Sequence, residues 1–78
     1  GDAVRFDVAR GLMEVEVKNR FAVGDRLECV HPSGNHEWAL ARMEDSAGGD
    51  VAIAPGNGHR VWLKLPPEKA GAFIARFI

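Results

Sequence analysis

Apolar and polar residues alternate along most of this 78-residue chain, and this pattern more than any other limits what the chain can fold into. In the runs 4–8 and 13–17 an apolar residue occupies every second position, which is the period of a strand with one buried face. Arg10-Gly11 lies between the two runs and favours a tight turn, because glycine accepts a positive φ. Residues 4–17 are therefore predicted to form a β-hairpin.

Turn signals divide the rest of the chain into short extended runs. Gly24-Asp25, Pro32-Ser33-Gly34-Asn35 and Gly48-Gly49-Asp50 combine residue types that favour turns. Only 67–71, with proline at its start and glycine at its end, is predicted to form one turn of helix. Such spacing is typical of a small barrel or sandwich. We predict one all-β domain over residues 1–78, a six- to seven-stranded antiparallel β-barrel, whose further strands are 26–31, 36–43, 51–54, 61–65 and 73–78.

Composition narrows the classes of function. Hydrophobic residues make up 46% of the chain and charged residues 27%, which indicates a globular domain and excludes a disordered one. The formal net charge of −1 excludes a polycation that binds nucleic acid by charge alone. No apolar run is long enough for a membrane helix, and no signal peptide opens the chain. We expect no membrane partner and a cytoplasmic location, because the single cysteine indicates a reducing compartment.

Cys29, His31, His36 and His59 are the side chains that suit a soft metal ion. Their spacing matches no zinc pattern, so we expect no metal site. The simpler interpretation is that Cys29 is buried beside Leu27.

Glu14 and Glu16 share a strand face and lie about 7 Å apart, twice the rise per residue, a separation that an inverting glycosidase uses. Glutamate alternating with valine is also the ordinary pattern of a solvated sheet face, and we favour this interpretation.

Gly56-Asn57-Gly58 could present backbone amides to a phosphate. Because no helix is predicted to follow it, a hairpin turn is the favoured interpretation.

Two groups of cations are candidates for binding. Arg60, Trp62 and Lys64 are predicted to share one strand face, where the indole could stack on a base while the cations meet phosphate. The alternative is that Trp62 covers an end of the barrel. Lys18, Arg20 and Arg26 form a second basic group. The sequence leaves open whether the fold brings the two groups together.

Three stretches carry a resemblance to a known family. They are residues 16–28, which contain Lys18-Asn19-Arg20-Phe21, residues 30–35, which contain His31-Pro32-Ser33-Gly34-Asn35, and residues 54–62. Over residues 4–78 the chain resembles the C-terminal domain of the collagenase-like peptidases, family thirty-two of the unassigned peptidases.

The resemblance implies a larger protein in which an N-terminal catalytic domain precedes a small β-barrel similar to the second domain of elongation factor Tu. The family is named for collagen degradation. The branch that this chain resembles most is implicated in prephenate-dependent hydroxylation of the wobble uridine of tRNA. The cysteines that hold a cluster or act in catalysis lie in the other domain. The resemblance therefore implies no cofactor in this domain, no catalytic residue in it, and no such role for Cys29.

We expect from this a non-catalytic accessory domain whose partners are the N-terminal catalytic domain and tRNA. Two alternatives remain open, a protein-substrate exosite of a protease and a structural or dimerisation cap, and the oligomeric state is open too. The expected tRNA-binding or partner-binding residues are Lys18, Arg20, Arg26, Arg60 and Lys64, with Trp62 as a stacking platform.

Overall fold

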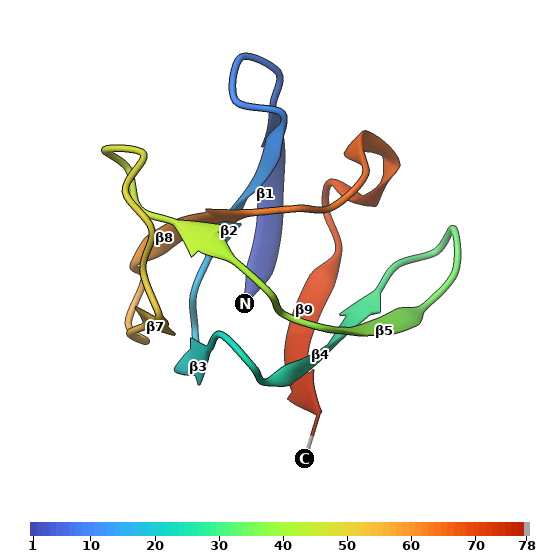
Figure 1. The fold of residues 1–78 in the computed structure, drawn as a ribbon. Coiled ribbons are helices and arrows are strands. Elements are labelled where there is room, and N and C mark those ends of the chain that lie inside the picture. Colours follow the sequence, from blue (N-terminus) through green and yellow to red (C-terminus); the bar gives the residue numbers. More distant parts are fainter. Residues whose placement is uncertain (78) are drawn as a thin grey trace.

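The computed structural model describes residues 1–77, with side chains to Arg76, and shows an all-β fold (Figure 1). Seven strands form one curled antiparallel sheet in the order β5-β4-β9-β1-β2-β8-β6, and β3 pairs with β7 beside it. The all-β prediction is confirmed, although the sheet curls as a half-barrel with β5 and β6 as its two edges. The strands are β1 Asp2–Asp7, β2 Leu12–Glu16, β3 Phe21–Ala22, β4 Arg26–Val30, β5 His36–Ala39, β6 Met43–Glu44, β7 Ile53–Ala54, β8 Arg60–Leu63 and β9 Phe73–Phe77.

The predicted hairpin is confirmed. β1 and β2 are antiparallel neighbours, with Asp2 opposite Glu16 and Asp7 opposite Leu12. Gly11 closes the turn with a φ of 68°, which a residue with a Cβ adopts only at a cost. The short helical turn is also confirmed as the 3₁₀ helix η1 over Pro67–Lys69.

Other predicted strands differ in length. The run 36–43 is divided into β5 and β6, because Leu40 turns inward and bonds with the loop before β4. Its amide donates to the Asp25 carbonyl over 2.9 Å, and its carbonyl accepts from the Gly24 amide over 2.8 Å. β8 ends at Leu63 and β7 covers only Ile53–Ala54. The last strand begins at residue 73 as predicted, and residue 78 lies outside the described residues.

The turn at residues 56–58 is present but does not join a hairpin. Asn57 and Gly58 both have positive φ, 66° and 83°, as an Asn-Gly turn requires. Their amides donate to the carbonyls of Lys18 and Val17, over 3.4 and 2.8 Å, and β7 pairs with β3 instead of β8. The prediction of a hairpin here is therefore wrong, because the turn bonds to the segment that follows β2.

The core lies on the inner face of the curled sheet. Met13, Leu63 and Met43 face one another from β2, β8 and β6, and each is at most 1% exposed. Leu27 and Cys29 are fully buried on β4, as predicted. The remaining core residues are Ala3, Val15, Val17, Phe21, Leu40, Ala54, Val61, Leu65, Ala72 and Ile74.

Leu63→Ala should test the centre of this core. The substitution removes buried methyl groups and leaves a cavity, so we expect the free energy of unfolding to fall by about 2–5 kcal/mol. Urea denaturation followed by circular dichroism measures the change. Val8→Ala, at a side chain that is 84% exposed, is the control and should change stability by less than about 0.5 kcal/mol. Equal effects of the two substitutions would contradict this core.

Candidate functional site

Trp62 lies in the outer face of the sheet between two carboxylates. β8 pairs with β2 on one side and β6 on the other, which places Glu14 and Glu44 opposite Trp62. Val61 and Leu63 point inward, as the alternation predicts. The outer face at this position is therefore a row of charged side chains with one indole in its middle.

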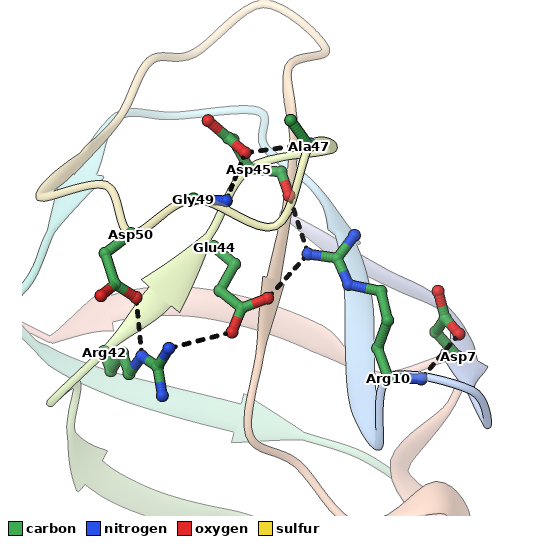
Figure 2. A network of polar contacts seen from close by, with 8 residues as sticks. All are labelled: Asp7, Arg10, Arg42, Glu44, Asp45, Ala47, Gly49 and Asp50. Atoms are coloured by element: carbon green, nitrogen blue, oxygen red, sulfur yellow. Dashed lines mark hydrogen bonds and ion pairs between the residues drawn. The ribbon is translucent and has the colours of Figure 1, made fainter.

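Arg10 covers the indole. Its guanidinium carbon lies 4.3 Å from the ring centroid of Trp62. The same guanidinium donates to Glu44 Oε1 over 2.9 Å and to the Asp45 carbonyl over 2.8 Å (Figure 2). Only 8% of Trp62 is exposed. The expectation of an open stacking platform at Trp62 is wrong, because a cation from the β1–β2 turn already occupies its face.

A second chain of contacts holds Glu44 from its other oxygen. Arg42 donates to Glu44 Oε2 over 3.2 Å and to Asp50 over 2.7 Å (Figure 2). Asp45 closes its own turn by accepting from the amides of Ala47 and Gly49, each over 2.9 Å. This network fixes the loop after β6 against the turn that carries Arg10.

Glu14 is a buried carboxylate held by two arginines. Only 5% of the residue is exposed, and Oε1 accepts from Arg5 Nε over 2.8 Å while Oε2 accepts from Arg60 Nη1 over 2.5 Å. The Arg5 bond, helped by Arg60, lowers the Glu14 pKa below its ordinary value although burial acts against it. The expectation of a solvated face is wrong at Glu14, and a carboxylate held in its charged form by two cations is unsuited to donate a proton.

Glu16 brings two of the predicted cations together. Lys18 Nζ donates to Glu16 Oε1 over 2.8 Å, and Arg60 Nη2 lies 3.5 Å from Glu16 Oε2. The hydrogen bond with Lys18 lowers the pKa of Glu16 and raises that of Lys18. Lys18 and Arg60 are therefore neighbours, although both are paired with acid.

Strand direction gathers more cations at this end of the half-barrel. β2 finishes at this end and β8 begins here, with Glu16 opposite Arg60. β9 starts level with Glu16, since both pair with Asp2, and runs on from there beside β4, so Arg76 and Arg26 lie further out at the same end. Figure 1 shows β3 and the C-terminus at the same end. We call the cations at this place the basic end; its members are Lys18, Arg20, Arg26, Arg60 and Arg76.

The basic end contains a hollow of about 490 Å³ between β9 and the segment before β3. Arg20 and Arg76 line it together with Phe73, which is 49% exposed. Arg20 is exposed and makes no hydrogen bond or ion pair with any residue from 1 to 77. Within the part of the chain that the structure describes, Arg76 has only a distant partner, Asp25, at 3.9 Å. The hollow offers two guanidinium groups and an aromatic ring to an anionic ligand.

The remaining predicted residues lie apart from this hollow. Arg26 is exposed on β4 and donates to Glu37 Oε1 over 2.9 Å. Lys64 follows the last residue of β8, at the opposite end from Arg60. Four of the six predicted site residues are thus brought to one end, and Trp62 and Lys64 lie elsewhere.

Cys29 and the histidines do not gather into a metal site. Within residues 1–77 no three histidine, cysteine or acidic side chains come close enough to hold an ion. His31 accepts from the Ser33 amide over 3.0 Å, and His59 contacts the Gly56 carbonyl. Burial raises the pKa of the Cys29 thiol, which disfavours the reactive thiolate.

Arg10, Trp38 and Arg76 are the residues that sequence reasoning missed. Arg76 stands two residues from the end of the chain, where a short apolar strand gives little reason to single out a cation. His36, Trp38 and Leu40 occupy every second position and so share one strand face, a pattern that indicates a face toward the core. Arg10 belongs to the turn that the sequence predicts. Its proximity to Trp62, 52 residues later, has no signal in the local sequence.

The fold and charges define a small all-β module with cations gathered at one end. No helix in residues 1–77 is long and apolar enough to cross a membrane. Residues 1–76 match the family model described as the peptidase family U32 C-terminal domain. The chain therefore belongs to this family, as the resemblance implied.

Curated relatives and solved structures agree with the assignment. The chain is 47% identical over 57 residues to the tRNA hydroxylation protein P of Escherichia coli and 37% identical over 59 residues to that of Haemophilus influenzae. These matches cover 73% and 76% of this chain and 13% of each relative. The crystal structure of the C-terminal domain of a U32 peptidase-family protein from Geobacillus thermoleovorans superposes with a TM-score of 0.82 at 21% identity, covering 96% of this chain and 86% of that one. That likeness confirms the fold.

Glu14→Gln should weaken the fold and change its pH dependence. Since the folded pKa of Glu14 lies below 4.5, its contribution to stability is present above pH 4.5 and is lost as pH falls through the folded value. We expect the substitution to cost about 1–2 kcal/mol at pH 7, discounted because both arginines are partly solvated. Urea denaturation between pH 7 and pH 3 measures both effects. Glu37→Gln, at a surface pair, is the control, and an equal pH dependence in the Glu14 variant and wild type would contradict the assignment.

Arg10→Gln should uncover Trp62. Loss of the cation over the ring is expected to lower stability by about 0.5–2 kcal/mol and to make Trp62 accessible to acrylamide. Fluorescence quenching measures the accessibility, in a Trp38→Phe background so that Trp62 is the only tryptophan. Arg42→Gln, which leaves the Arg10 contact in place, should not change the quenching. A Trp62 that stays protected after Arg10→Gln would show that other groups cover it.

Proposed function

We propose that this chain is a non-catalytic accessory domain of a U32-family enzyme that modifies tRNA, and that it helps to hold the tRNA. The proposal draws on two relatives described as tRNA hydroxylation protein P. The chain spans about 13% of the length of these relatives, so catalysis is assigned to the rest of a longer parent protein, which is also the domain's first partner. We assign no cofactor to the domain and place the parent in the cytoplasm.

The observation that carries the proposal is the hollow beside Phe73. The guanidinium groups of Arg20 and Arg76 line it, and guanidinium recognises phosphate through planar, paired hydrogen bonds. Phe73 offers a half-exposed ring at its edge, and unstacked RNA bases stack on such rings. An anionic polymer with flat bases satisfies both features.

The charge balance sets how strong this contact is. Lys18 and Arg60 share Glu16, and Arg26 is paired with Glu37, so acid compensates part of the basic end. The whole chain has a formal net charge of −1. The domain therefore contributes a few phosphate contacts that position the tRNA, while the rest of the parent supplies most of the affinity.

Charge removal at the hollow tests this role in the full-length parent. The double variant Arg20→Gln/Arg76→Gln should bind tRNA more weakly, and its plot of log affinity against log salt should become shallower by about 0.7–0.9 per lost phosphate contact. Filter binding between 50 and 200 mM salt gives the slopes. The control Lys69→Gln removes a cation outside the basic end and should leave the slope unchanged. Equal slopes in wild type and the Arg20/Arg76 variant would refute the proposal.

A structural cap is the second candidate. Val30 and Phe73 lie opposite each other on β4 and β9 and are 40% and 49% exposed, an apolar pair on the outer face. If the rest of the parent covers this pair, Val30→Ser should lower the melting temperature of the parent and leave the salt dependence of tRNA binding unchanged. This result, with no effect of the arginine variant, would replace the first candidate by the second.

A further inference from the structure

Two hollows of the half-barrel share Trp38 and Lys64 among their lining residues. The first measures about 270 Å³ and is lined by Leu12, Trp38, Leu40, Met43, Trp62 and Lys64, among others. The second measures about 400 Å³, and Phe6, His36, Trp38, Lys64, Leu65 and Pro66 are among its lining residues. The indole of Trp38 borders both spaces, so we refer to the pair of hollows as the Trp38 groove.

Trp38 is accessible in a way that Trp62 is not. It is half-buried on β5, which is an edge strand of the sheet. The ring of His36 lies beside it, with centroids 5.2 Å apart and planes tilted by 38°. No described cation stacks on the Trp38 ring, whereas Arg10 covers Trp62. An aromatic ligand can therefore approach Trp38 without displacing a stacked cation.

The charges around the groove are complementary to an anion. Lys64 is exposed and makes no hydrogen bond or ion pair with the part of the chain that the structure describes. Glu44, the acid that lines the first hollow, has its two oxygens occupied by Arg10 and Arg42. The second hollow has no acidic residue among its lining residues. A ligand with a flat apolar ring and an adjacent negative group matches an indole next to an unpaired ammonium.

The groove lies near one member of the basic end. Ala39, which lines the first hollow, is paired with Arg26 across β5 and β4. Trp38 is the residue before Ala39 and faces the other side of the sheet, opposite Leu27. A single strand that contacts Arg26 would therefore have to pass around the β5 edge to place a base at Trp38.

From this arrangement we propose that the Trp38 groove binds an unpaired base of the RNA, which stacks on Trp38 while Lys64 contacts a neighbouring phosphate. The inference rests on the proposed tRNA-binding role and adds a site to it. Base–aromatic stacking tolerates any base, because every base has a π face. The groove is therefore a stacking site without sequence preference.

Substitution of Trp38 in the full-length parent tests the site. Trp38→Ala should weaken tRNA binding by about tenfold, the scale of one lost base–aromatic stack, and Trp38→Phe should retain most of the affinity. Lys64→Gln should make the salt plot shallower by about 0.7, the value for one contact to a single strand. Val8→Ala is the control for an exposed position outside the groove. Circular dichroism shows whether each variant is folded. If the Trp38→Ala variant is not folded, the tRNA affinities of Trp38→Phe and Lys64→Gln decide whether the site exists.

Ultraviolet cross-linking to tRNA locates the base directly. Trypsin releases Trp38 in the peptide 27–42 and Trp62 in the peptide 61–64, so mass spectrometry separates the two tryptophans. We expect the added nucleotide on 27–42. A nucleotide on 61–64 instead, or full tRNA affinity in both Trp38→Ala and Lys64→Gln, would overturn the site.

The two proposals fail in different ways. If Arg20→Gln/Arg76→Gln weakens tRNA binding and the Trp38 and Lys64 variants do not, the tRNA-binding role stands and the stacking site is refuted. If none of these variants changes tRNA binding, both proposals are refuted.

Discussion

The carboxylate of Glu14, held between Arg5 and Arg60, is the contact on which the outer face of the sheet depends. The three side chains come from adjacent strands, β2, β1 and β8, and join them from outside while the apolar core joins them from inside. A buried carboxylate without partners would be very costly, so these positions require cations. Arg60 also lies beside Glu16. The same outer face continues to Trp62, whose ring is covered by Arg10. Arg5, Arg10 and Arg60 are engaged in these contacts and are not free to bind a ligand. Among the described residues, the cations without a close acidic partner include Arg20, Lys64 and Arg76.

Much of the fold could be predicted from the alternation of residues. The β1–β2 hairpin, the burial of Leu27 and Cys29, and η1 follow from local pattern and turn chemistry. The division of the run 36–43 could not be predicted, because it depends on bonds between Leu40 and the loop before β4. Alternation assigns a residue to one of two faces, and it carries no information about a third segment that covers the outer face. The environment of Trp62 was predicted wrongly for that reason, and that of Glu14 because its burial depends on Arg5 and Arg60 from the two neighbouring strands.

The candidate site could be predicted in part. The pairing of the strands explains which part could be predicted. Antiparallel pairing puts the end of β2 beside the start of β8, which brings Lys18 to Arg60 through Glu16. Lys64 follows the last residue of β8 and lies at the other end of this strand from Arg60. The fold therefore separates Arg60 and Lys64, which alternation along one strand had grouped together. Arg76 joins the basic end because β9 runs beside β4. That pairing joins residues about fifty positions apart, beyond the reach of any local pattern.

One seam in the sheet has a mechanical consequence. The seven strands consist of two well-paired ladders, β5-β4-β9 and β1-β2-β8-β6, and between them only Asp2 and Phe73 are paired in register. Trp38 belongs to the first ladder, whereas Lys64 follows the last strand residue of β8 in the second. Four backbone hydrogen bonds beside this pair close the seam: two between Gly1 and Ile74, one from Ala3 to Ala72 and one from Gly71 to Ala3. The residues at the start of β1 therefore join the ladder that carries Trp38 to the ladder that leads to Lys64, and these few bonds help to set the distance between the indole and the ammonium.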